Sequence, residues 1–191
     1  MSDDKKWPRG EALKVAEEIA EVLRPCCVRF EIAGSLRRGK SRVSDVEVLF
    51  IPLIESRADP NDLFGNKILF DVANQQVEAL TTRRVIEPRL NVDGRQSWGY
   101  KNKLAVHVAT GIPVDFFATT EENWWVSLVV RTGSLESNLR LTRGALDRGR
   151  TLLAYGCGVQ NIETGQVTRA ESEREVFELC GQTYRPPEER G

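Results

Sequence analysis

Histidine is nearly absent from this sequence, because His107 is the only one among 191 residues. A Ser-His-Asp or Cys-His catalyst would have to use that single imidazole, and a site that needs two or three imidazoles is excluded. We therefore expect any bound metal ion to be held by oxygen atoms, which favours Mg²⁺ or Mn²⁺ over zinc. His107 lies in a strand-like alternation and is interpreted as a structural residue.

The four cysteines show no C-x-x-C spacing, and Cys26 and Cys27 are neighbours. This excludes a zinc knuckle and disfavours a disulfide framework, so we expect reduced thiols and a cytoplasmic protein. The first residues lack the apolar region of a signal peptide. No apolar run approaches the roughly 20 residues of a membrane span, and we expect no membrane association.

Charge is balanced overall but unevenly placed along the chain. The net charge is −1, yet basic residues outnumber acidic ones over residues 37–42, 83–103 and 131–150. Two interpretations stay open: a mixed solvated surface, or a basic channel suited to phosphates on a neutral body.

Hydrophobic periodicity and turn residues predict an α+β fold. We expect helices over residues 10–23, 68–80, 121–130 and 135–148, and strands over 26–33, 44–51, 85–90, 104–110 and 112–118. Residues 55–66 are expected to form a loop, and a hairpin and a short helix follow residue 150. A palm-like sheet-and-helix body should occupy residues 1–132 and a smaller subdomain residues 133–191.

One glycine-rich segment fits two different motifs. Residues 34–41 read Gly-Ser-Leu-Arg-Arg-Gly-Lys-Ser, which matches the phosphate loop of P-loop NTPases. That motif requires a long helix directly after it, whereas a strand-like run begins only three residues later. A P-loop NTPase is therefore a remote alternative.

Two carboxylates share one face of the predicted strand over residues 44–51. Asp45 and Glu47 are two positions apart, while Val46 and Val48 point into the core. Adjacent carboxylates repel unless cations lie between them, and a pair of Mg²⁺ ions can serve in-line phosphoryl displacement. Asp115, in an apolar strand, offers a third carboxylate. A half-exposed strand edge would also explain the pattern.

Four motifs in order resemble a known family. Residues 34–39 followed by 44–47 resemble the signature of the polymerase β-like nucleotidyltransferase superfamily and, more narrowly, of X-family DNA polymerases. Residues 132–134 with Asn138 resemble the turn of that family that meets the nucleotide's sugar and base edge. The closing motif of the family's thumb is resembled by residues 173–177 and 184–190. Pro8 and Arg9 fit the start of its palm. The similarity is weakest over residues 55–110.

The resemblance implies a minimal palm-plus-thumb nucleotidyltransferase, which we expect to be a monomer. It would add a dNTP, or an NTP, to the 3′-hydroxyl of a primer-template or gapped DNA and release pyrophosphate. Two Mg²⁺ ions, replaceable by Mn²⁺, would be held by the catalytic carboxylates Asp45, Glu47 and Asp115. The implied nucleotide-binding residues are Gly34, Ser35, Arg38, Ser44, Thr132, Gly133 and Asn138.

Four basic residues are candidates for contacts with the nucleic acid. The resemblance places Arg140 or Arg143 near the template strand. Lys101 and Lys103 lie in an aromatic-basic run over residues 98–103 that suits base stacking and phosphate contact. A hairpin tip that packs its own aromatics is an equal alternative for this run.

Three departures from the family pattern modify these expectations. Glu47 stands where X-family polymerases usually carry Asp, which favours Mn²⁺ or slower chemistry. Val130 and Arg131 stand where an aromatic usually faces the sugar, so we expect weak exclusion of ribonucleotides and similar dATP and ATP affinities. Near-neutral charge predicts weak, salt-sensitive, distributive DNA binding. The leading hypothesis for the function is gap-filling DNA synthesis. The alternatives are a template-independent or ribonucleotide-adding transferase and an inactive binding module.

Overall fold

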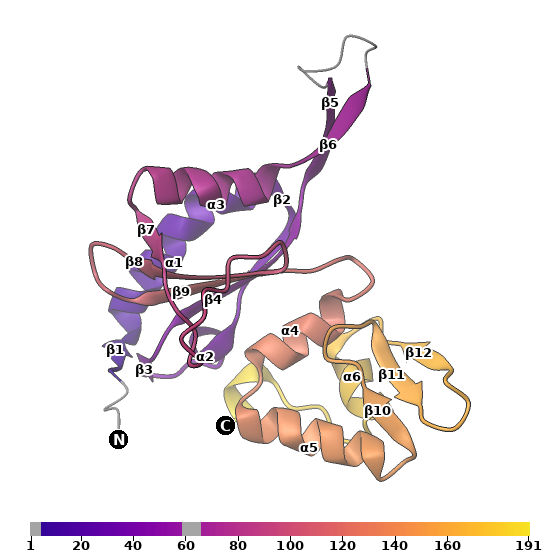
Figure 1. Ribbon diagram of the computed structural model, residues 1–191. Helices are drawn as coiled ribbons and strands as arrows, with labels where there is room; N and C mark the ends of the chain where they lie inside the picture. The colour runs from indigo at the N-terminus through magenta and orange to yellow at the C-terminus, as the bar shows by residue number, and fades with distance from the viewer. Residues whose placement is uncertain (1–4, 59–65) are drawn as a thin grey trace.

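A five-stranded mixed sheet forms the centre of the larger part of the molecule (Figure 1). The computed structural model describes residues 5–58 and 66–191. In spatial order the strands are β2 (Cys27–Ile32), β4 (Val46–Pro52), β9 (Pro113–Ala118), β8 (Asn102–His107) and β7 (Ile86–Pro88). β4 and β9 are parallel and the other pairs antiparallel. The predicted α+β class is confirmed.

One face of this sheet packs on two helices, α1 (Arg9–Leu23) and α3 (Val72–Thr82). Side chains alternate between the faces of a strand, so Val46 and Val48 lie in this core, as predicted. The helix predicted over residues 10–23 is confirmed as α1, whose buried residues recur at helical spacing. Glu47 and Asp115 lie on the opposite face of the sheet.

The helix α4 (Trp124–Thr132) joins two cores. Its residues Trp124 and Leu128 pack on Leu49 and Phe117 of the sheet, and Trp124 is almost fully buried. On its other side, Val126 and Val129 enter the core of the C-terminal part.

The C-terminal part consists of a small sheet between helices. Its elements are α5 (Leu135–Leu146), β10 (Arg150–Leu152), β11 (Gly158–Asn161), β12 (Val167–Arg169) and α6 (Glu173–Leu179). β11 and β12 form the predicted hairpin and β10 adds a third strand. Ser134 and Ser172 cap α5 and α6 by accepting from backbone amides, as expected of N-cap serines.

Short elements complete the fold. They are η1 (Arg24–Cys26), α2 (Gly34–Arg37), η2 (Pro187–Glu189), and the paired strands β1 (Trp7–Pro8) and β3 (Arg42–Val43). Because β3 and β4 follow Lys40 where a P-loop needs a long helix, the P-loop alternative is excluded.

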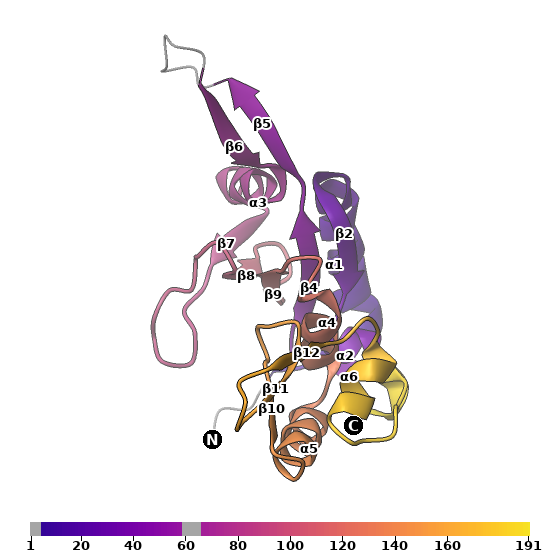
Figure 2. The ribbon, with the colours of Figure 1, turned by 90° about the vertical axis from the view of Figure 1, so that its right-hand side faces the viewer.

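Two predictions about local structure are wrong. Residues 55–58 belong to a strand, β5 (Ile54–Ala58), which pairs with β6 (Lys67–Asp71); residues 59–65 of the predicted loop lie outside the described residues. The helix predicted from residue 68 begins only at Val72, where Asp71 accepts a hydrogen bond from Asn74 N at 2.7 Å. The β5–β6 ribbon projects away from the sheet (Figures 1 and 2).

The predicted alternation of β2 also fails at one position. A register shift between Cys27 and Arg29 turns Val28 outward, and its side chain is 64% exposed. His107 is a buried residue whose Nδ1 bonds to Thr110, which confirms its structural interpretation. Among the helices of the described residues, none has the length and apolar content to cross a membrane.

Candidate active site

A tight turn places the backbone of Gly34 against the carboxylate of Glu47. Gly34 has a φ of +61° at the start of α2, and a Cβ atom there would overlap Glu47 Oε2. Both the backbone conformation and the close approach therefore require glycine. The glycine-rich segment predicted to bind nucleotide and the carboxylate strand are thus in direct contact.

The three predicted catalytic carboxylates come together on one side of the sheet. Glu47 and Asp115 are directly paired across the parallel strands β4 and β9, and Asp45 precedes β4 by one residue. Neighbouring residues in register project from the same face, which brings the two carboxylates side by side. Asp115 is 7% exposed, so little water screens this group.

Burial raises the pKa of each of these carboxyls, and repulsion between carboxylates adds to the rise for Glu47 and Asp115. Burial, reinforced by Asp45, raises the pKa of Glu47 to about 8. Burial raises the pKa of Asp115 to about 6, although the Arg89 cation opposes it. The pKa of Asp45 is also raised by burial, against the pull of Arg89 and Arg38. Such a cluster gains stability from any added positive charge.

Arg89 supplies one positive charge, and the sequence analysis missed it. Its Nη2 donates to both oxygens of Asp115, at 2.7 and 2.9 Å. Arg89 follows β7 and belongs to the basic stretch over residues 83–103, which was the available signal. Nothing in that stretch indicated which of its cations would face a carboxylate 26 positions away.

The carboxylates suit hard divalent cations by chemistry, but they do not form a closed metal cage. Within residues 5–58 and 66–191, no group of three or more His, Cys, Asp or Glu side chains has the arrangement of a metal site. Asp115 has both oxygens engaged by Arg89, and Glu47 is protonated at neutral pH because its pKa is about 8. A cation would have to displace that proton and loosen that ion pair.

Three of the predicted nucleotide-binding side chains hold buried polar atoms that lack a partner. Ser35 Oγ, Arg38 Nε and Asn138 Oδ1 have no hydrogen-bond partner among the described residues. Buried polar atoms are normally paired, so an orphaned set in one region favours a missing polar ligand. Burial lowers the pKa of Arg38, while Glu47 and Asp45 oppose the shift, which places this cation beside the carboxylates.

The same residues connect α2 to the turn after α4. Arg38 Nη1 donates to the carbonyl oxygens of Thr132 and Gly133, and Asn138 Nδ2 donates to Val130 O at 2.9 Å. A Cβ at Gly133 would overlap Asn138. Of the remaining predicted nucleotide-binding residues, Thr132 is buried and Ser44 lies exposed beside Asp45. The structure thus gathers six of the seven around the α2–α4 contact and places Ser44 at the carboxylates.

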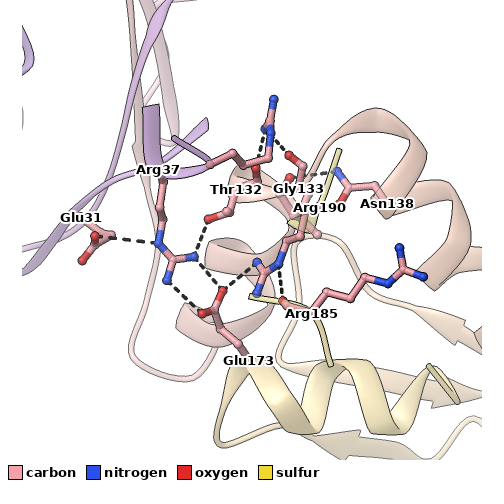
Figure 3. A network of polar contacts seen from close by, with 10 residues as sticks. Glu31, Arg37, Thr132, Gly133, Asn138, Glu173, Arg185 and Arg190 are labelled. Carbon is pink, nitrogen blue, oxygen red and sulfur yellow. Dashed lines mark hydrogen bonds and ion pairs between the residues drawn. The ribbon is translucent and has the colours of Figure 1, made fainter. Parts of the chain in front are cut away.

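A buried ion network joins the two parts of the molecule next to this turn (Figure 3). Arg37 donates to both oxygens of Glu173, at 2.8 and 2.9 Å, and to Thr132 Oγ1. The fully buried Arg190 donates to Glu173 as well. The sequence analysis assigned Glu173 to the closing motif of the thumb and did not pair it with Arg37, because the two lie 136 positions apart.

The four predicted nucleic-acid contacts differ in exposure. Lys101 and Arg143 are exposed, and Arg140 pairs with Glu136 one helical turn away. Lys103 is only 6% exposed and donates to Gly99 O, so its ammonium is turned into the protein. The assignment of Lys103 as a nucleic-acid contact does not hold, because Lys103 occupies one of the buried positions that alternate along β8.

Two comparisons with known proteins support the resemblance to X-family DNA polymerases that the motifs predicted. Residues 127–191 match the family described as DNA polymerase beta thumb. Over 187 residues, 97% of this chain, the sequence is 30% identical to the DNA polymerase/3'-5' exonuclease PolX of Bacillus subtilis (strain 168). The chain spans 28% of the length of that relative. The thumb match starts inside α4, the helix shared by both cores; the predicted boundary at residue 133 stays a prediction.

Proposed function

We propose that this protein is a nucleotidyltransferase that extends the 3′-hydroxyl of DNA with dNTPs and releases pyrophosphate, with gap-filling synthesis as its principal reaction. The observation that carries the proposal is the convergence of three buried carboxylates with orphaned polar atoms of Ser35, Arg38 and Asn138. Phosphoryl transfer needs positioning and charge neutralisation more than covalent chemistry, and this site offers both.

Asp45, Glu47 and Asp115 are proposed to hold two Mg²⁺ ions, which Mn²⁺ can replace. Carboxylate oxygen is the ligand that these hard cations prefer, and added positive charge would oppose the burial that raises the pKa of all three carboxyls. When bound, the ions would neutralise charge on the attacking and leaving oxygens. Asp115 is proposed to accept the proton of the primer 3′-hydroxyl.

The α2 turn is proposed to bind the triphosphate. Ser35 Oγ and Arg38 Nε are the free donors at this turn, and Gly34 lets the backbone approach closely. Thr132, Gly133 and Asn138 would meet the sugar and base of the nucleotide. Lys101, Arg140 and Arg143 are the proposed DNA contacts.

Ribonucleotide addition is the second candidate, and the orientation of Arg131 favours it. The Arg131 guanidinium lies 3.6 Å from the centroid of the Phe117 ring on the sheet, so the side chain turns away from the α4–α5 turn. The position expected to screen a 2′-hydroxyl is therefore without a bulky wall. Equal dATP and ATP affinities would support this candidate, and strong deoxy preference would contradict it.

Primer extension tests the proposal. Gapped, primer-template and single-stranded substrates should be incubated with Mg²⁺ or Mn²⁺ and each dNTP. We expect extension on gapped DNA, and a loss of roughly a hundredfold or more for Asp115→Asn, which removes the proposed proton acceptor. The exposed Asp93→Asn serves as the matched control and should extend like the wild type. Unchanged activity in Asp115→Asn would overturn the mechanism.

A further inference from the structure

A pocket of about 260 Å³ lies on the carboxylate face of the sheet, beyond the carboxylates themselves. On β4, Leu49 and Ile51 follow Glu47 on the same face; on β9, Phe117 follows Asp115. These three side chains form the floor of the pocket. It therefore continues the surface of the candidate active site and is separate from the α2 turn proposed for the triphosphate.

The walls of the pocket are polar and partly cationic. Asn102, Asn123 and Ser127 line it, and the cations Lys101 and Arg131 lie at its side. The Arg131 cation also acts on Glu47 and opposes the rise in its pKa. The pocket thus has an apolar floor, hydrogen-bonding groups around it and positive charge beside it.

An aromatic side chain from the C-terminal part closes the pocket. Tyr155, in the turn between β10 and β11, lines it, and its backbone carbonyl accepts from Asn123 Nδ2 at 3.3 Å. Its ring lies 5.9 Å from the Arg131 guanidinium. Tyr155 is 67% exposed, so its ring is available to a ligand. Tyr100, also 61% exposed, stands at another part of the lining.

We propose that this pocket binds one unpaired nucleobase together with its adjoining phosphate, with the base against the exposed Tyr155 ring and beside the Arg131 guanidinium, which covers the Phe117 ring. A nucleobase has apolar faces and a polar edge, which match the floor and the asparagine and serine walls. Its phosphate would meet Lys101 or Arg131. Base stacking on aromatic side chains next to cations is the common mode of single-strand binding. The base is either an unpaired position of a strand or a free nucleotide.

This subsite rests on the proposed function for its relevance, but binding tests it independently. The assay omits dNTPs and contains EDTA, so that metal-dependent chemistry contributes nothing. Fluorescence anisotropy compares a labelled dT12 strand with a 12-mer of abasic residues that carries the same phosphates. The ratio of the two affinities isolates the contribution of the bases.

Two variants remove the subsite in different ways. Tyr155→Ala deletes the exposed ring but keeps the backbone carbonyl that holds Asn123, and Ser127→Leu fills the pocket from α4. We expect each to lower the base-over-abasic preference by at least about fivefold, the low end of single-base stacking. Tyr155→Phe keeps the ring and should keep the preference, as should Val28→Ala on the edge strand β2.

Competition with dTMP or dAMP then separates the two sources of the base. If millimolar mononucleotide displaces dT12 from the wild type and not from Tyr155→Ala, the pocket accepts a free nucleotide. If mononucleotide does not compete while both variants lose the preference, the pocket reads a base within a strand. If the wild type and both variants prefer bases over abasic residues equally, the subsite is overturned, even if primer extension succeeds. If the variants lose this preference but the wild type extends no primer, the subsite stands and the proposed function is contradicted.

Discussion

Glu47 has the most perturbed acidity among the three carboxyls, and its cause is physical crowding. Burial and the neighbouring Asp45 raise its pKa from 4.5 to about 8, and Asp115 adds to the effect. A carboxyl whose folded pKa is raised stabilises the fold below its unfolded pKa and loses that contribution as pH rises through the folded value. The metal-free protein should therefore lose stability between pH 4.5 and 8.

Glu47→Gln should remove this pH dependence. In EDTA at pH 8 we expect the variant to melt roughly 2–4 °C above the wild type, which corresponds to about 1 kcal/mol for a protein of this size. At pH 3.5 the two should melt together, since the Glu47 carboxyl is then neutral in both the folded and the unfolded protein. Differential scanning calorimetry measures this, with the exposed Glu87→Gln as control. A constant difference at both pH values would assign the effect to packing.

Arg89 competes with any cation for Asp115, because its Nη2 contacts both carboxylate oxygens. Arg89→Gln removes a positive charge and frees the carboxylate, and both changes favour a divalent ion. We expect the Mg²⁺ concentration for half-maximal primer extension to fall at least about threefold, the size of one partly exposed charge pair. Arg95→Gln, on the same exposed loop, should leave the Mg²⁺ midpoint unchanged. A higher midpoint in Arg89→Gln would mean that Arg89 assists metal binding.

α2 and α6 are held together by a carboxylate between two guanidinium groups. Glu173 contacts Arg37 and the fully buried Arg190, and these cations keep the pKa of Glu173 below its usual value although burial opposes them. Arg38 reinforces the same junction through the carbonyls of Thr132 and Gly133. The nucleotide-binding turn is therefore positioned by contacts between the two parts of the chain.

Glu173→Gln should destabilise the protein by roughly 3 kcal/mol at pH 7, because it leaves the fully buried Arg190 without a counter-charge. Because the folded pKa of Glu173 is lowered, its carboxylate stabilises the fold above the unfolded pKa near 4.5 and loses this contribution as pH falls through the folded pKa. The difference in unfolding free energy between the wild type and the variant should therefore shrink in acid. Urea unfolding measures both effects. Glu171→Gln, whose partner Arg169 is exposed, is the control and should change stability little.

Periodicity predicted elements well where one face is continuously buried, and poorly elsewhere. α1 and β9 follow their apolar spacing, whereas β5 mixes Glu55, Ser56 and Arg57 and gives no strand pattern. β5 forms because β6 pairs with it, which is a contact between segments. In the site, Asp45 and Glu47 were found by local spacing. Arg89 and the Arg37–Glu173 pair were missed because their partners lie far along the chain.

The whole molecule combines two cores, one shared helix and almost no net charge. α4 supplies Trp124 and Leu128 to the sheet and Val126 and Val129 to the C-terminal core, so the two parts meet through one element. With a net charge of −1, DNA affinity has to come from local cations. Lys101 and Arg143 are the exposed candidates, while Lys103 is buried and Arg140 is partly neutralised by Glu136.

Salt dependence of DNA binding tests this distribution of charge. Each phosphate contact contributes about 0.9 to the slope of log affinity against log salt, so a chain with few exposed candidate cations should show a shallow slope and weak binding at physiological salt. Arg143→Ala should reduce the slope by about one and weaken all sequences equally. Lys103→Ala should leave the slope unchanged, because its ammonium bonds to Gly99 O inside the protein, and should lower the melting temperature instead. Anisotropy titrations of gapped DNA between 50 and about 200 mM salt measure these slopes. A slope reduced by Lys103→Ala and untouched by Arg143→Ala would place the DNA on the β8 side of the sheet and not along α5.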